Sequence, residues 1–381
     1  GGERVMTAVD RVLIVGGGIA GTSLAIELGR QGIEAEIVER EPVWGATGTG
    51  ITLMGPALRA LKTLGVLEQC LPDGYGVDEM KAFTADGEFL EAVPLAGLLG
   101  AGYPAISGMM RPDLHRVLSQ TALSEGASVR VGVTVAALDR TDDNVDVRFT
   151  DGTRGSYDLV VGADGCHSAV RRMMLGDAAP EPRFLGQVVW RALVERPAKV
   201  TGLWMFYGSR HKTGFTPLTP ERMYVFLVEL AQDRTRPAPA ERPGLMRELL
   251  AEFGGVMAEV RETIRDPDQV DVRALEALLL EPPWYRGRVV LIGDAAHATT
   301  PQLAMGGAIA LEDAIVLAAL LGSETTVEET LSKFMDRRYE RSRLVVENSV
   351  QLAEWEKNAA AHGEDSAQLM GESYAALAAP I

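Results

Sequence analysis

Three glycines near the start of the chain have a spacing that suits dinucleotide binding. Gly16, Gly18 and Gly21 form the pattern G-x-G-x-x-G, directly after an apolar run and before a helical pattern. In such a turn the first glycine permits a tight bend, the second lets backbone approach a pyrophosphate, and the third permits close packing of helix on strand. Glu39 ends the next apolar run, where an acid that binds a ribose is expected. We predict a dinucleotide site rather than a merely structural glycine-rich turn.

A second candidate lies in VVLIGDAAHATTP, residues 289–301. Asp294 follows a predicted strand, and a carboxylate at the end of a strand can accept hydrogen bonds from a sugar or ribityl hydroxyl. Gly306 and Gly307 precede an apolar helix predicted over 308–321, whose free N–H groups suit a ring that becomes negative on reduction. Because aspartate is also a common turn former, a strand–turn–helix without a ligand remains the alternative.

A third candidate is LVVGADGCHSAVRR, residues 159–172. Asp164 and Gly165 end a predicted strand, and Arg171 and Arg172 lie about two turns into the segment that follows. The turn alone does not explain why an acid and two glycines are followed by two adjacent arginines. A turn followed by a solvated basic face is the alternative.

The remaining reactive side chains are isolated in the sequence. His297 could act in acid–base catalysis, although structural hydrogen bonding would also explain it. Cys166 could be reactive or a small packing residue. No metal-ligand spacing and no serine in a nucleophile elbow occurs, so we expect no metal and no protein nucleophile.

The elements that must position these residues are read from the apolar periodicity. A strand at 11–15, a helix at 19–32 and a strand at 34–40 form a βαβ unit, and aromatic-rich strands follow within 184–283. We also expect a helix at about 56–70, a hairpin at 80–93, a helix at 111–126 and a helical tail from about 327. The predicted fold class is α/β: a Rossmann-like dinucleotide-binding domain interleaved with a mixed β-sheet substrate domain, plus C-terminal helices. The predicted boundaries are 6–78, 107–183 and 284–330 for the first domain, 79–106 and 184–283 for the second, and 331–381 for the C-terminal helical segment.

The bulk composition excludes several classes of partner. The 381 residues carry a formal net charge of −16, which disfavours nucleic acid and anionic membranes. The apolar runs look too short to span a bilayer. Two widely separated cysteines and the lack of a visible signal peptide favour a reducing, cytoplasmic setting.

The three motifs GGGIAG, GADGCHSAVRR and LIGDAAHATTP resemble those of the class A flavoprotein monooxygenases, the family of para-hydroxybenzoate hydroxylase. GGGIAG with Glu39 resembles the FAD fingerprint. The second resembles the Asp-Gly motif, which in that family serves FAD and the pyridine nucleotide. The resemblance implies that this turn shapes the flavin cleft and that Arg171 and Arg172 help to hold anionic cofactor groups. The third resembles the Gly-Asp motif, whose aspartate holds the flavin ribityl chain. The resemblance keeps the family's order and spacing over about residues 10–345.

The resemblance implies FAD as cofactor, NADPH or NADH as a transient electron donor, and O₂ and a small aromatic molecule as substrates. The implied cofactor contacts are Gly16, Gly18, Ile19, Ala20, Gly21, Glu39, Arg40, Gly50, Ile51, Arg111, Val135, Asp164, Gly165, Gly293, Asp294, Pro301, Gly306 and Gly307. Catalysis would depend on the backbone around Pro301, Gly306 and Gly307 rather than on a side-chain dyad. Many relatives read Gly-Gln-Gly where this chain reads Ala304-Met305-Gly306. A monomer and a homodimer both remain open.

The predicted substrate contacts lie in the aromatic-rich strands, because an aromatic-lined pocket suits a planar substrate. They are Tyr207, Phe215, Phe226 and His211. Alternation along a strand sends some of these aromatics into the core, and the sequence does not decide which.

The function implied by the resemblance is single-component hydroxylation of an electron-rich aromatic or N-heteroaromatic ring through a flavin C4a-hydroperoxide. The main alternative is a flavoprotein of the same fold with other chemistry, a halogenase or a lipid or polyene reductase. Halogenases of this fold usually carry W-x-W-x-I-P, which VVWRALVE does not match. A protein that holds FAD without turnover is the third possibility.

Overall fold

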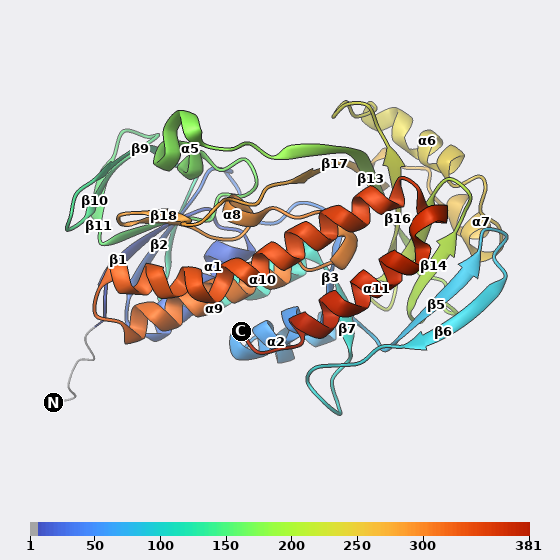
Figure 1. Ribbon diagram of the computed structural model, residues 1–381, viewed down its shortest axis with the longest axis horizontal. Coiled ribbons are helices and arrows are strands. Elements are labelled where there is room, and N and C mark those ends of the chain that lie inside the picture. The colour runs from blue at the N-terminus through green and yellow to red at the C-terminus, as the bar shows by residue number, and fades with distance from the viewer. Residues whose placement is uncertain (1–6) are drawn as a thin grey trace.

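The computed structural model describes residues 7–381 (Figure 1). Met6, where the first predicted domain segment begins, lies outside the described residues. Two large sheets organise the chain, and helices pack around them, so the predicted α/β class is confirmed.

A six-stranded sheet carries the glycine-rich turn. Its order is β18-β19-β12-β1-β2-β8, with parallel pairing except between β18 and β19. Its strands are β1 (Arg11–Val15), β2 (Glu34–Glu39), β8 (Ser128–Val131), β12 (Leu159–Gly162), β18 (Tyr285–Arg286) and β19 (Val289–Leu291). The central strands are continuous apolar runs because helices and a small sheet cover their faces.

Several helices, among them the apolar α9 (Gly306–Ser323) and the long α10 (Val327–Glu356), pack beside this sheet. α9 packs against α1 (Ile19–Arg30), α2 (Gly55–Thr63) and α10. α10 runs across the face seen in Figure 1 and returns as α11 (Ala359–Leu377), which ends near α2. Length and composition alone would let α9 cross a membrane, but it is mostly buried inside the protein as a core helix.

A seven-stranded mixed sheet forms the second layer, in the order β17-β13-β16-β15-β14-β5-β6. Its strands are β5 (Glu79–Thr84), β6 (Phe89–Pro94), β13 (Arg183–Glu195), β14 (Leu203–Tyr207), β15 (Lys212–Pro217), β16 (Arg222–Leu230) and β17 (Val270–Ala277). Buried side chains of α6 (Arg242–Leu249) and α7 (Gly255–Arg261) share a core with one face of this sheet. The other face turns toward the cavity described below.

Smaller elements connect the layers. One three-stranded sheet joins β3 (Gly50–Leu53), β7 (Ile106–Met110) and β4 (Tyr75–Val77), and another joins β9 (Val135–Arg140), β10 (Val145–Phe149) and β11 (Arg154–Tyr157). The short helices are α3 (Leu67–Cys70), α5 (Ala169–Leu175) and α8 (Asp294–His297), and the longer α4 (Arg111–Ser124) packs on α1.

Two expected boundaries differ from the structure. The helix expected over 56–70 is divided into α2 and α3, because Gly65 adopts a left-handed φ of 72° that ends the first helix. The predicted boundary between residues 330 and 331 falls inside α10. The domain boundaries stay a prediction.

Candidate active site

A cavity of about 640 Å³ is lined by residues of the seven-stranded sheet, of β3, and of the turns that follow β1, β12 and β19. Eleven of the predicted cofactor contacts line it: Gly18, Ile19, Ala20, Gly50, Ile51, Arg111, Gly165, Asp294, Pro301, Gly306 and Gly307. The others lie behind this wall or away from it: Gly16, Gly21, Glu39, Arg40, Val135, Asp164 and Gly293.

Each of the three motif glycines is needed for its own structural reason. A Cβ on Gly16, whose φ is 109°, would lie 2.1 Å from the carbonyl oxygen of Ala163, and a Cβ on Gly21 would lie 2.1 Å from the carbonyl oxygen of Gly16. A Cβ on Gly18 would meet no atom within 4 Å, because this residue faces the cavity. Gly16 and Gly21 therefore serve close packing of the protein itself, whereas Gly18 leaves room for a ligand.

Glu39, the acid predicted to bind a ribose, points toward its own loop. The carboxylate of Glu39 accepts hydrogen bonds from the backbone N–H groups of Gly17 (3.3 Å) and Glu41 (3.0 Å). The Arg40 side chain is 80% exposed and lies beside Glu41, and Val135 is buried in β9. These three residues are therefore supports or surface groups in this structure, and none of them lines the cavity.

Asp294 opens α8 after Gly293, whose φ is 61°. Its carboxylate faces the cavity, while a buried network holds the backbone behind it. Burial raises the pKa of Asp294, and the charges of His297 and Arg111 oppose that rise. Because the side chain is accessible from the cavity, water there moderates the effect of burial.

The network behind Asp294 is centred on Asp313. Its Oδ2 accepts hydrogen bonds from the Gly293 N–H (2.9 Å) and from His297 Nε2 (2.5 Å), and its Oδ1 accepts one from Arg338 Nε (2.8 Å). The side chains of His297, Asp313 and Arg338 are fully buried. His297 therefore supports the Gly-Asp turn, which agrees with the structural alternative, and its ring does not line the cavity.

The same network reaches the end of the chain. Glu312 pairs with Arg338 (3.1 Å) and accepts two hydrogen bonds from Arg341 (2.8 and 2.9 Å). Arg341 and Arg59 also donate to backbone carbonyls within residues 377–379. The C-terminal residues, α10 and the Gly-Asp turn are therefore joined by contiguous charged hydrogen bonds.

The expected role of the two adjacent arginines in holding the cofactor is not what the structure shows. Arg171 is fully buried and donates to the carbonyl oxygens of Cys166 (2.8 Å), Ala295 (2.9 Å) and Pro180 (3.1 Å). It thus ties the Asp-Gly turn (residues 163–168) to the Gly-Asp turn (residues 292–298). Arg172 is half-exposed and lies 3.7 Å from Glu181.

The Asp164 carboxylate also points into its own turn. It accepts hydrogen bonds from the Ser168 hydroxyl and from the Val170 N–H (3.1 Å), and Ser168 in turn caps α5. Burial raises the pKa of Asp164, although these hydrogen bonds lower it. The structure therefore assigns Asp164 to the shape of the turn, and Gly165 and Cys166 to the cavity wall.

The far wall carries backbone donors. Gly306 and Gly307 begin α9, whose first N–H groups have no side-chain cap, and both residues line the cavity with Pro301. Ala304, which also lines it, has a φ of 53° and is the one non-glycine residue of 7–381 with positive φ. This conformation favours glycine, the residue that the family resemblance implies at this position, so the chain accepts local strain beside the cavity.

The wall on the seven-stranded sheet is cationic. Arg191 lies 5.9 Å from the ring of Tyr224, whose hydroxyl lies 2.9 Å from that of Thr52. The buried Nε of Arg191 has no hydrogen-bond partner among the described residues. Burial, together with the charges of Arg191 and Arg273, lowers the pKa of Arg111.

None of the four predicted substrate residues lines the cavity. Phe215 is fully buried on the α6 and α7 side of its sheet, opposite Val225, because alternation turns it away from the cavity. Tyr207 is 48% exposed, and His211 lies 3.5 Å from Glu252. Phe226 is half-buried beside Tyr224, and Tyr224 is the β16 aromatic that reaches the cavity.

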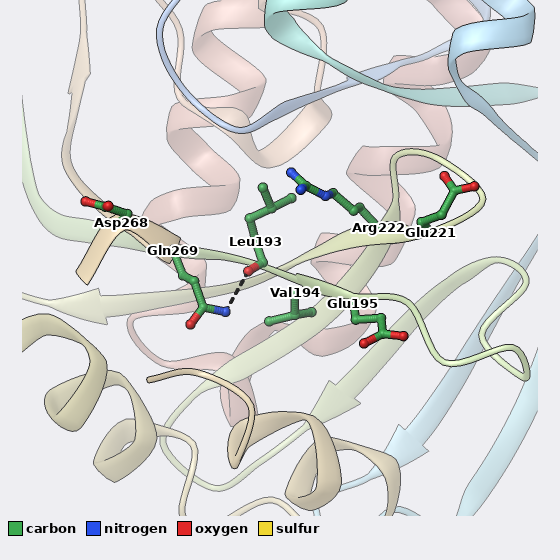
Figure 2. Close-up of a pocket in the computed structure, with 7 residues that line it drawn as sticks. All are labelled: Leu193, Val194, Glu195, Glu221, Arg222, Asp268 and Gln269. Atoms are coloured by element: carbon green, nitrogen blue, oxygen red, sulfur yellow. Dashed lines mark hydrogen bonds between the residues drawn. The ribbon is translucent and has the colours of Figure 1, made fainter. Parts of the chain in front are cut away.

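A second hollow lies away from these residues, at one end of the same sheet (Figure 2). Gln269 donates to the Leu193 carbonyl there (3.0 Å), and Glu221, Arg222 and Asp268 are exposed. It is an open surface hollow without converging reactive groups, so the larger cavity is the candidate active site.

Known proteins resemble the chain over nearly its whole length. Residues 10–349 match the FAD binding domain family. The 2-heptyl-3-hydroxy-4(1H)-quinolone synthase of Pseudomonas aeruginosa is 36% identical, covering 91% of this chain and 90% of that protein. The 3-amino-4-hydroxybenzoate 2-monooxygenase of Streptomyces cremeus is 34% identical, covering 90% and 87%.

A solved structure shares the fold. Klebsiella pneumoniae HpxO, complexed with FAD and uric acid, superposes with a TM-score of 0.82 at 26% identity, covering 97% of this chain and 92% of that one. The predicted family, the enzymatic activity and FAD as cofactor are thereby confirmed. The chain belongs to the FAD-dependent monooxygenases of class A, enzymes that hydroxylate aromatic and heteroaromatic substrates.

Proposed function

We propose that this enzyme hydroxylates a planar, electron-rich aromatic or N-heteroaromatic molecule that carries an anionic or acidic group. The observation that carries the proposal is the unpaired, buried Nε of Arg191 beside Tyr224 on the cavity wall. A buried donor without a partner is costly, so a substrate oxygen or ring nitrogen that accepts its hydrogen bond would be favoured. The ring would lie against Tyr224, whose hydroxyl pairs with Thr52.

The positive charge on the cavity wall is local, because the protein as a whole carries a net charge of −16. Arg111, Arg191, Arg236 and Arg273 line one cavity; Arg236 is exposed, and Arg273 is compensated by Asp271 at 2.7 Å. Of the less exposed guanidinium groups, two thus remain for anionic partners: Arg111, beside Gly48, and Arg191, beside Tyr224. We assign the first to FAD and the second to the substrate. The relatives named above are a synthase of a hydroxyquinolone and a monooxygenase of an aminohydroxybenzoate, which supports a substrate of this chemical class.

The residues that line the cavity fit FAD. The open space at Gly18 admits a pyrophosphate, Asp294 offers a carboxylate for a ribityl hydroxyl, and Arg111 offers a guanidinium. The N–H groups of Gly306 and Gly307 would stabilise negative charge on a reduced ring. When bound, FAD would supply the redox and oxygen chemistry, while this chain orients the substrate and excludes water. NADH or NADPH would be the transient donor.

The reaction is tested by flavin reduction without oxygen. NADH and NADPH are mixed with the enzyme in the presence of phenols, aminohydroxybenzoates, hydroxyquinolones or urate. We expect one acidic ring class to accelerate reduction and, once O₂ is admitted, to gain one oxygen atom by mass spectrometry. If every compound leaves the rate unchanged and none is oxygenated, the proposed substrate class is wrong.

With the substrate so found, Arg191→Gln is expected to lower kcat/KM by about 10- to 150-fold, because a hydrogen bond to a charged group is worth about 1.5–3 kcal/mol. The matched control is Arg222→Gln, since Arg222 lies in the separate hollow of Figure 2. Steady-state kinetics would contradict the assignment if the two variants behaved alike.

Asp294→Ala is expected to reduce the FAD retained during purification, because it removes an acceptor on the cavity wall. Asp294→Asn should keep part of it, since an amide oxygen still accepts. Absorbance ratios of protein and flavin measure retention, with the exposed Asp268→Ala as control. Full flavin content in Asp294→Ala would remove this residue from the cofactor site.

We further propose that the enzyme acts in the cytoplasm as a monomer or homodimer. The two cysteines, Cys70 and Cys166, are free, which agrees with a reducing compartment.

A further inference from the structure

Three side chains that can bind a divalent metal ion converge at the edge of the cavity. Cys166 and His167 belong to the Asp-Gly turn, and Glu276 belongs to β17. One ligand atom from each lies within 4.8 Å of the other two, and all three residues line the cavity. Because the two segments are far apart in the sequence, the cluster cannot be recognised from a metal-ligand spacing. We propose that Cys166, His167 and Glu276 form a site for zinc or a similar soft divalent cation, whose occupancy obstructs the cavity.

One of the distances between the ligand atoms is already close to what zinc requires. With Zn–S near 2.3 Å and Zn–N and Zn–O near 2.0–2.2 Å, tetrahedral ligands lie about 3.3–3.7 Å apart. His167 Nε2 and Glu276 Oε2 are already 3.7 Å apart. The side chain of His167 is 67% exposed, so it can rotate onto a cation held by the other two. Three protein ligands leave the fourth position to water.

Cys166 and Glu276, the two less exposed ligands, lie on segments that are fixed by hydrogen bonds. The Cys166 carbonyl accepts a hydrogen bond from buried Arg171, which fixes the turn on which the thiol sits. Glu276 pairs with Phe184 across the β17–β13 ladder. The site therefore needs little reorganisation, and most of it falls on the exposed histidine.

The local charge also favours a cation. The carboxylates of Asp294 and Glu276 both act electrostatically on the Cys166 sulfur. Their negative charges attract a divalent ion, and a coordinating ion removes the thiol proton outright. Glu276 Oε2 is buried without a hydrogen-bond partner among residues 7–381, while Arg234 faces the other oxygen, Oε1, at 3.5 Å.

The ligand set selects the metal. A thiolate, an imidazole and one carboxylate suit zinc, cadmium or cobalt, whereas magnesium and calcium prefer oxygen ligands only. A cation here would stand beside Gly165 and Asp294 on the cavity wall. Its occupancy would narrow the approach of the nicotinamide nucleotide or the substrate, so zinc would act as a reversible inhibitor of flavin reduction.

The test uses the tag-free, FAD-loaded enzyme. Equilibrium dialysis against Zn²⁺ should load one ion per chain, and Co²⁺ should give tetrahedral d–d bands to the red of the flavin absorption. Cys166→Ala and Glu276→Gln should each weaken binding at least about tenfold, since even outer-shell partners cost 10- to 100-fold. Cys70→Ala is the matched control, because Cys70 is the other free cysteine and lies buried elsewhere. Arg234→Gln should bind more tightly.

The outcomes distinguish a specific zinc site from adventitious binding, and binding from obstruction of the cavity. Zinc binding that Cys166→Ala leaves unchanged, or Mg²⁺ binding of equal strength, would overturn the site and indicate adventitious acidic binding. Zinc should slow anaerobic flavin reduction in the wild type and Cys70→Ala, but not in Cys166→Ala, and a chelator should restore the rate. If zinc binds through Cys166 and reduction keeps its full rate, the obstruction of the cavity is refuted.

Discussion

Arg338→Ala is expected to lower the free energy of unfolding by about 3–5 kcal/mol and to reduce FAD retention. Arg338 is fully buried, and it donates to Asp313 at 2.8 Å and to Glu312 at 3.1 Å. Its removal would leave two buried carboxylates without their shared cation, which costs far more than an exposed pair. Because Asp313 also holds the Gly293 N–H, the change should loosen the turn that presents Asp294.

Urea unfolding of the apoprotein and flavin content of the purified variant measure the two effects separately. Arg343→Ala is the matched control, since Arg343 lies on the same helix but pairs with Glu340 and Glu347 at the exposed surface. It should behave like the wild type in both assays. A variant at 338 that is as stable as the control would contradict the role assigned to the network.

Arg338→Ala should also change how the free energy of unfolding depends on pH under acidic conditions. Burial alone would raise the pKa of Asp313, but the charges of His297 and Arg338 hold it below its usual value. A lowered folded-state pKa gives stability that is present above the unfolded value of about 3.9 and lost as pH falls through the folded value. The wild type should therefore lose more stability than Arg338→Ala below about pH 4.

Gly18→Ala should leave the apoprotein stable but weaken FAD binding at least about tenfold, which corresponds to about 1.4 kcal/mol. The added methyl group would meet no protein atom within 4 Å and would project into the cavity. Gly16→Ala should instead destabilise the protein itself, because its methyl group would lie 2.1 Å from the Ala163 carbonyl oxygen at a φ of 109°. Strain and overpacking of about 1–3 kcal/mol each give roughly 2–6 kcal/mol for that variant.

Thermal denaturation of the apoproteins and FAD titration distinguish the two glycine variants. We expect a normal melting temperature with poor FAD affinity for Gly18→Ala, and a strongly lowered melting temperature for Gly16→Ala. If Gly18→Ala bound FAD as tightly as the wild type, the pyrophosphate would have to lie elsewhere on the cavity wall.

Local backbone chemistry made much of this enzyme predictable from its sequence. The glycine-rich turn, the strand before it and the helix after it depend on neighbouring residues, so β1 and α1 lie where the apolar periodicity places them. The position of Asp294 at a strand end follows in the same way. These segments also carry the family resemblance, which matches the chain over residues 10–349.

The direction of individual side chains depends on tertiary packing instead. Asp164 and Arg171 lie in a recognisable motif, yet their hydrogen bonds go to the protein. Asp164 accepts from the Val170 N–H of its own turn, whereas Arg171 donates to the Ala295 carbonyl of the Gly-Asp turn, a partner that is distant in sequence. Phe215 and Tyr224 lie on neighbouring strands with similar composition, and only the face covered by α6 and α7 decides that the first is core. Short-range pattern thus determined the cofactor and the family. The folded sheets alone decided the arginine wall and the Cys166–His167–Glu276 cluster, because their members meet only across long sequence separations.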